Sequence, residues 1–139
     1  MKLESAASGG RVEDWDLSFS MQNGCEQLSS RSLLQEAWTR MQAPHGRDLR
    51  LIRDIAASFQ YNLARGIAQL AIHAAGRDGQ NKIALSGGVA YNHAIRETIR
   101  TEVTEHAFEC VMNRDYPLGD GCVSFGQCVY AAHQLGMKD

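Results

Sequence analysis

The stretch Lys82-Ile83-Ala84-Leu85-Ser86-Gly87-Gly88-Val89-Ala90-Tyr91-Asn92 leads from a short apolar strand, through two consecutive glycines, into a helix. The strand is predicted over residues 82–85 and the helix over 92–106, where apolar residues recur at four-residue steps. Two glycines leave bare backbone N–H groups, with no Cβ to keep a phosphate or a purine away. Because open α/β sheets bind ligands at the carboxyl ends of their strands, the glycine turn is a candidate ligand site.

Several familiar chemistries do not fit this turn. No Gly-Lys-Ser/Thr follows it, so it is not a Walker loop, and its glycine spacing differs from the dinucleotide-binding fingerprint. Ser86 has no evident base and is not in a Gly-x-Ser-x-Gly sequence, which argues against a nucleophile elbow. Asn92 is explained by capping its helix. The residues alone therefore identify no catalytic group.

A second turn of small residues, Leu118-Gly119-Asp120-Gly121-Cys122, comes about thirty residues later, before a helix predicted over 124–135. It sets one carboxylate, Asp120, between two glycines. A carboxylate at the start of a helix can hold Mg²⁺ or another divalent ion against a nucleotide phosphate. The plainer interpretation is an Asp that accepts hydrogen bonds from the backbone of its own turn, and the residues leave both interpretations open.

Hydrophobic periodicity and turn residues predict an α/β fold of one domain, in which a hairpin precedes two parallel strands joined by a right-handed crossover. The longest helix should pack closely on a neighbour at Gly66, which lies in its interior. The expected elements are a helix over 1–8, a strand over 15–21, a turn at Asn23-Gly24, a strand over 25–28, a helix capped by Ser29 or Ser30 and ending near Pro44-His45-Gly46, a helix from Asp48 to about Ala75, strands over 82–85 and 108–112, and the two helices named above.

Composition excludes several functions. The chain has 139 residues, with 14 basic and 16 acidic side chains, a net charge of −2 and no basic stripe, which argues against nucleic-acid binding. Its four cysteines form no C-x-x-C pair and its five histidines no H-x-x-x-H pair, so no zinc site is expected from local spacing. With no signal peptide and no membrane span in the sequence, a cytoplasmic protein without membrane contacts is expected.

Three segments together resemble the C-terminal part of HypF, the carbamoyltransferase family of [NiFe]-hydrogenase maturation. The segments are Asp54-Ile55-Ala56-Ala57-Ser58-Phe59-Gln60, the run from Leu85 to Asn92, and the run from Pro117 to Gln127, and the opening Leu3-Glu4-Ser5-Ala6-Ala7 is similar as well. The resemblance covers nearly the whole chain. It implies one lobe of an actin-like (RNase H-like) ATPase fold, with a mixed sheet flanked by helices. The same fold is shared with the tRNA threonylcarbamoyl transferases.

The resemblance also implies a chemistry, namely transfer of a carbamoyl group by way of ATP and a carbamoyl-adenylate. By matching positions, the nucleotide would contact Ser86, Gly87, Gly88, Asn92 and Gly121, and Asp120 would be a ligand of a divalent metal (Mg, Fe or Zn). The partners implied are an upstream lobe and a HypE-like acceptor protein. Self-association of a lone lobe is also expected.

The chain departs from the family pattern in ways that affect activity. Where the family has Asp-Gly-Gly, this chain has Asp120-Gly121-Cys122, and the family's upstream histidine pair and other domains have no counterpart in the sequence. We therefore expect one wall of a two-lobed site over residues 1–139, with little turnover by this chain alone. Two alternatives stay open: a non-catalytic nucleotide-binding or assembly module, and an actin-like phosphotransferase fragment of other specificity.

Overall fold

A computed structural model describes residues 2–44 and 48–136 and contains all the predicted helices and strands. The predicted helix end at Pro44-His45-Gly46 lies partly outside the described residues. In chain order the elements are α1 (Lys2–Ala7), β1 (Phe19–Gln22), β2 (Cys25–Leu28), α2 (Ser30–Met41), α3 (Leu49–Arg77), β3 (Lys82–Leu85), the 3₁₀ turn η1 (Gly88–Tyr91), α4 (His93–Glu105), β4 (Glu109–Met112), the 3₁₀ turn η2 (Asp120–Cys122) and α5 (Val123–Gln134).

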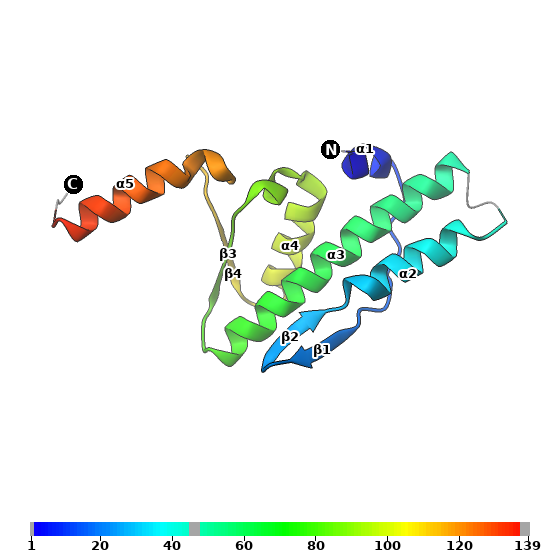
Figure 1. Cartoon of the computed structure of the whole chain (residues 1–139), viewed down its shortest axis with the longest axis horizontal. Coiled ribbons are helices and arrows are strands. Elements are labelled where there is room, and N and C mark those ends of the chain that lie inside the picture. Colours follow the sequence, from blue (N-terminus) through cyan, green and yellow to red (C-terminus); the bar gives the residue numbers. More distant parts are fainter. Residues whose placement is uncertain (1, 45–47, 137–139) are drawn as a thin grey trace.

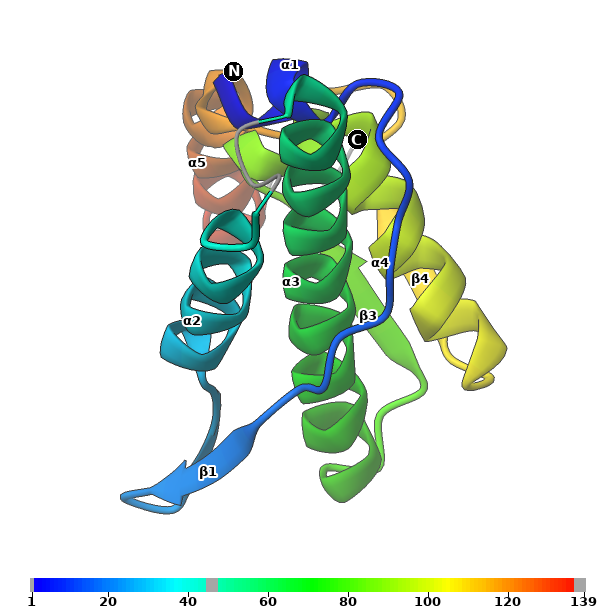
Figure 2. The same ribbon diagram turned by 90° about the vertical axis from the view of Figure 1, so that its right-hand side faces the viewer.

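Helix α3 is the centre of the molecule, and α1, α2 and α4 all pack against it (Figures 1 and 2). Its first turn is capped by Asp48, whose side chain accepts a hydrogen bond from the backbone of Arg50. Ala64 and Ala68 are fully buried, and such small side chains let neighbouring helices approach closely. Among the described residues, no helix combines the length and the apolar character needed to cross a membrane.

Two apolar cores lie on either side of α3. One joins α3 to α4 and to the β3–β4 pair, with Ile99 and Val103 buried against it. The other joins α3 to α2 and the residues before the hairpin, and its buried members are Trp15, Leu33 and Ile55. Burying side chains of this size stabilises the fold by about 1.5–3 kcal/mol each.

The strands form two separate two-stranded sheets in the described part of the chain, which refines the expected single mixed sheet. Strands β1 and β2 are antiparallel, and Asn23 and Gly24 at their turn have φ of 52° and 77°, the left-handed geometry that an Asn-Gly hairpin requires. Strands β3 and β4 are parallel, with Leu85 opposite Met112, as the crossover predicts. The α/β class is confirmed.

The strand predicted over 15–21 is shorter in the structure, where β1 begins at Phe19. The residues before it run alongside α3 instead, from α1 toward the hairpin (Figure 2). Three polar side chains of α3, one turn apart, bind the backbone of this segment: Asp54 accepts from the N–H of Arg11 at 2.7 Å, Ser58 from that of Glu13 at 3.0 Å, and Asn62 from that of Trp15 at 2.9 Å. The alternation over 15–18 therefore reflects an extended segment that turns Trp15 and Leu17 inward, outside the β1–β2 ladder.

Gly66 lies where the sequence predicts close packing. A Cβ built on it would lie 2.6 Å from Cδ2 of Leu28, so the side chain at the end of β2 fills the space that the glycine leaves. This contact packs the hairpin against α3. Further along the helix, a hydrogen bond of 2.9 Å between Nδ1 of His73 and a carboxylate oxygen of Glu26 also holds the hairpin against α3.

Candidate functional site

The structure brings the two small-residue turns into direct contact. The backbone N–H of Gly87 donates to the carbonyl of Leu118 at 2.6 Å, and the hydroxyl of Ser86 donates to the same oxygen at 3.0 Å. From the other side, the N–H of Gly119 donates to the hydroxyl of Tyr91 at 3.3 Å. The two turns, separated by about thirty residues, thus form one surface at the carboxyl end of β3, where parallel sheets bind ligands.

The glycines of this surface differ in backbone conformation and in the space around them. Gly87 has φ of 108°, a conformation that other residues rarely adopt. A Cβ on Gly119 would lie 3.0 Å from the ring of Tyr91 and 3.4 Å from Cα of Gly88, so the close approach of the two turns depends on it. Gly88 differs from both. A Cβ there would meet nothing within 4 Å, so the turn keeps an open space above its backbone.

Asn92 lies beneath the turn, with 2% of its surface exposed. Its side-chain oxygen accepts from the N–H of Ile95, which confirms the predicted cap of α4. Its NH₂ group donates to the side chain of Gln60 at 2.6 Å, and Gln60 in turn donates to the carbonyl of Leu3 at 3.3 Å. Asn92 therefore ties the turn to α3 and α1. Its predicted contact with a nucleotide stays a prediction.

Asp120 begins η2, directly after the glycine that touches Gly88, and its side chain is exposed. A Cβ on the next residue, Gly121, would be 3.5 Å from the ring of Pro117, an ordinary contact. The thiol of Cys122 donates to the carbonyl of Gly119 at 3.3 Å. Within residues 2–44 and 48–136, no three His, Cys, Asp or Glu side chains are grouped as a metal site. This surface offers one carboxylate, which suits Mg²⁺, since Mg²⁺ commonly takes one or two carboxylates with phosphate and water oxygens.

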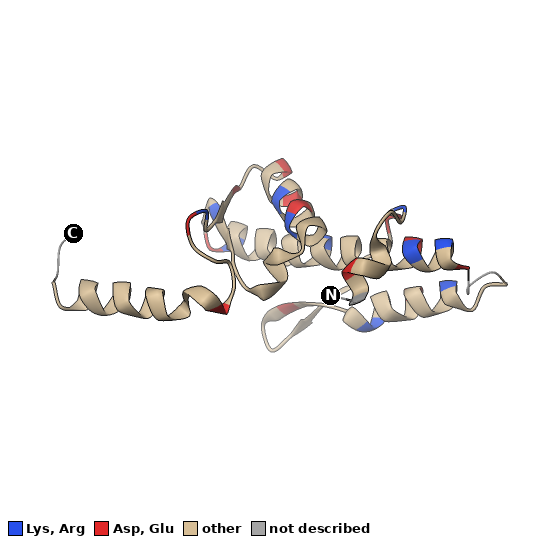
Figure 3. Ribbon diagram, turned by 90° about the horizontal axis from the view of Figure 1, so that it is seen from above, with Lys and Arg blue, Asp and Glu red and all other residues tan. Residues whose placement is uncertain are grey.

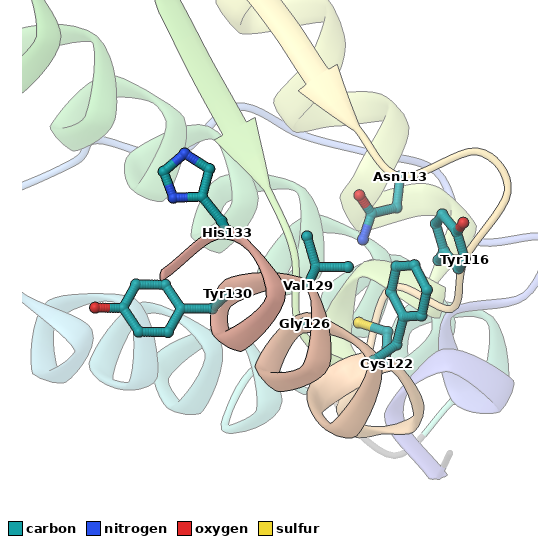
Figure 4. A pocket seen from close by; sticks show the side chains of 8 residues that line it. Asn113, Tyr116, Cys122, Gly126, Val129, Tyr130 and His133 are labelled. Carbon is teal, nitrogen blue, oxygen red and sulfur yellow. The ribbon is translucent and has the colours of Figure 1, made fainter. Parts of the chain in front are cut away.

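A further surface, which we did not predict from the sequence, is the apolar side of α5. The helix projects from the rest of the chain (Figure 1), and all of it is free of charged residues, as Figure 3 makes visible. A hollow of about 480 Å³ lies along it, close to η2 (Figure 4). The rings of Tyr116 and Phe125 stack there, with centroids 4.2 Å apart. The lining residues are Asn113, Tyr116, Cys122, Phe125, Gly126, Val129, Tyr130 and His133.

Exposure sets α5 apart from the other long helices of the described chain, since none of its residues is buried. Val129 and Tyr130 have 52% and 67% of their surfaces exposed. Contiguous apolar surface of this kind is typical of an interaction site. In the sequence, the signal was available as a twelve-residue helix without a single Asp, Glu, Lys or Arg.

Comparison with known proteins identifies the family to which this chain belongs. Residues 1–127 match the family model for "Carbamoyltransferase, Kae1-like Domain, second subdomain". Among curated proteins, the chain is 36% identical over 67 residues to the probable carbamoyltransferase HypF of Methanocaldococcus jannaschii, which covers 48% of this chain and 9% of that protein. It is 38% identical over 78 residues to the tRNA N6-adenosine threonylcarbamoyltransferase of Microcystis aeruginosa, covering 56% of this chain and 23% of that protein.

Solved structures agree with the sequence matches. The crystal structure of T. kodakarensis HypF superposes with a TM-score of 0.73 at 33% identity, over 98% of this chain and 17% of that one. A full-length HypF in a phosphate- and nucleotide-bound form has the same fold, with a TM-score of 0.77 at 22% identity over 96% of this chain and 17% of that one. The chain thus spans less than a fifth of the length of these HypF relatives. The chain belongs to the carbamoyltransferase family of the Kae1-like, HypF type, as its second subdomain.

Proposed function

We propose that this chain is the nucleotide-binding wall of a HypF-type carbamoyltransferase and that it binds ATP or carbamoyl-adenylate together with a divalent metal. The observation that supports the proposal best is the pair of hydrogen-bonded turns with open space above Gly88. Gly88 does not have a positive φ, and no neighbouring atom would exclude a Cβ there, so neither the turn nor its packing requires glycine at this position. The open space suits a ligand whose flat or anionic part approaches the backbone closely.

Each residue of the site has a role in this proposal. The backbone of Gly87 and Gly88, with Gly121 opposite, forms the surface on which the nucleotide lies, and Ser86 holds the two turns together through Leu118. Asp120 supplies the carboxylate that holds the metal. A divalent ion there would polarise the phosphoryl oxygens. Asn92 keeps the turn in position from below, through the hydrogen bond to Gln60.

The opposite wall of the site belongs, in this proposal, to the first subdomain of the same family. This is supported by the matched description, a second subdomain, and by the share of the HypF structures that the chain spans. The uncharged side of α5, with Tyr116 and Phe125 stacked beside it, is the surface on which we expect that subdomain to dock. Self-association through α5 is the alternative that sedimentation of the isolated chain would reveal.

The biological reaction follows from the same proposal. The match to HypF over nearly the entire chain supports carbamoyl transfer in hydrogenase maturation, with a HypE-like protein as the acceptor. Because the chain provides one wall, we expect the isolated protein to bind nucleotide without sustained carbamoyl-phosphate-dependent ATP cleavage. Steady cleavage by the purified chain would contradict the division of the site between two lobes.

Replacing the metal-binding carboxylate tests the proposal. We expect Mg²⁺ to strengthen ADP binding to the unmodified chain, and Asp120→Asn to remove about 1.5 kcal/mol, or about tenfold, of that Mg²⁺-dependent affinity. The measurement is a titration with ADP, with and without Mg²⁺, followed by NMR because a single wall binds weakly. Asp115→Asn, an exposed carboxylate in the same loop, is the matched control and should bind as the unmodified chain does.

Two results would overturn this assignment. If Asp120→Asn keeps the full effect of Mg²⁺, then Asp120 is not the metal ligand. If the unmodified chain shows no ADP binding at all at millimolar nucleotide, the non-catalytic assembly module becomes the better explanation.

A further inference from the structure

A small cavity lies at the carboxyl end of β4, between the first half of α4 and the loop that leads to η2. Its volume is about 190 Å³. The residues that line it are Arg96, Cys110, Met112, Asn113, Arg114 and Leu118. Two arginines thus line one space, and no Asp or Glu is among these lining residues. Leu118, which lines this cavity, also contacts the glycine turn, since its carbonyl accepts a hydrogen bond from the N–H of Gly87.

The polar groups of this cavity are largely without partners. Arg114 and Asn113 make no side-chain hydrogen bond or ion pair with any residue that the structure describes. Arg96 has only a long ion pair, 3.6 Å, to Glu97. That carboxylate is already engaged, because Arg100 donates to it at 2.8 Å, and this hydrogen bond lowers the pKa of Glu97. Five N–H donors on each guanidinium therefore remain almost unused.

Electrostatics and size indicate what fills the space. Two like charges that face one cavity repel each other, and an anion between them reverses that repulsion. Guanidinium groups bind phosphate and carboxylate oxygens in a bidentate manner, and the amide of Asn113 adds another donor. At about 30 Å³ per water, the cavity holds about six waters, which suits a small oxyanion and is too small for a nucleotide.

We propose that this cavity is an oxyanion site, in which Arg96, Arg114 and Asn113 bind a phosphate or carboxylate group. It is separate from the two-turn nucleotide site and does not depend on it. Leu118 links the two places: its carbonyl holds the glycine turn, and the residue also lines the cavity.

Titration with inorganic phosphate, followed by amide chemical shifts of the whole chain, tests the proposal. We expect saturable shifts at residues 110–114 and at Arg96, and at least a tenfold loss of affinity in the double variant Arg96→Gln/Arg114→Gln. Arg31→Gln/Arg50→Gln, which removes two positive charges from exposed positions outside the cavity, is the matched control for the change in total charge and should leave the affinity unchanged. Acetate in place of phosphate distinguishes a tetrahedral from a planar oxyanion, and sodium chloride at equal ionic strength distinguishes binding from screening.

The phosphate titration can fail while ADP binding succeeds, so the two proposals are tested independently. If phosphate causes no saturable shift at these residues, or if the double variant binds it unchanged, the oxyanion site is wrong even when ADP binds normally. Should the double variant unfold, the rate at which iodoacetamide alkylates Cys110 in the unmodified chain provides a second readout, and phosphate should slow it. An unchanged rate would also contradict the proposal.

Discussion

Asn62→Ala is expected to lower the free energy of unfolding by about 2–3 kcal/mol, because a buried backbone N–H and a partly buried carbonyl would lose their partners at once. Asn62 is fully buried and binds the N-terminal segment to α3. Its oxygen accepts from the N–H of Trp15 at 2.9 Å, and its NH₂ group donates to the carbonyl of Glu13 at 2.7 Å. The N–H of Trp15, which alanine would leave buried and unpaired, costs about 1–3 kcal/mol, and the carbonyl of Glu13 costs less because it is only partly buried.

Urea denaturation measures this loss directly. Native domains are stable by only about 5–15 kcal/mol, so the variant should unfold at a clearly lower urea concentration. Asn81→Ala removes the same side chain from an exposed position and should stay within about 0.5 kcal/mol of the unmodified chain. Equal midpoints for the two variants would mean that the segment from Arg11 to Trp15 does not depend on α3 for its position.

Gly88→Leu is expected to weaken nucleotide binding by about 2–3 kcal/mol, or about 30- to 150-fold, while leaving the fold intact. A Cβ at Gly88 would meet nothing within 4 Å in the chain itself, and the position is not at a positive φ, so we expect a side chain there to cost little stability. It would, however, occupy the space above the backbone that we assign to the nucleotide. Gly88→Ala should give a smaller loss, since its single methyl group fills less of that space.

The check is an ADP titration of each variant beside a thermal melt of each. Gly126→Leu, where a side chain also meets nothing within 4 Å, is the matched control and should bind ADP as the unmodified chain does. If Gly88→Leu binds with unchanged affinity and an unchanged melting temperature, the open space above the turn is not where the nucleotide lies.

Local signals in the sequence predict much of this fold. Asn23-Gly24 determines the hairpin because both residues must adopt positive φ, and Asp48 marks the start of α3 because its side chain caps the first turn. The strand expected over 15–21 is too long for a different reason. Its first residue, Trp15, bonds to the side chain of Asn62 on α3, a long-range contact that no local alternation reveals.

The candidate site, like the fold, has some features that the sequence predicts and others that depend on long-range contacts. The place of the first turn, directly after β3, is predicted by the sequence pattern. Its contact with the second turn is not, because the second turn begins at Leu118, well after β4 ends at Met112. The inward direction of the Asn92 amide does not follow, because it depends on Gln60 of α3. The cavity that Arg96 and Arg114 both line is also not evident in the sequence, since it forms only when α4 packs beside β4 and the loop after it. The direction of α5 is not predictable either, because a helix without charges has no strongly polar face to orient it.

The most direct test of the nucleotide site is to map where ADP binds, from the amide shifts of the isotope-labelled chain with Mg²⁺ present. We predict that the largest shifts fall on Gly87, Gly88, Gly119 and Asp120, and that they saturate together with one affinity. Shifts confined to another part of the chain, such as α1 and α2, or no saturable shift at any amide, would contradict this prediction.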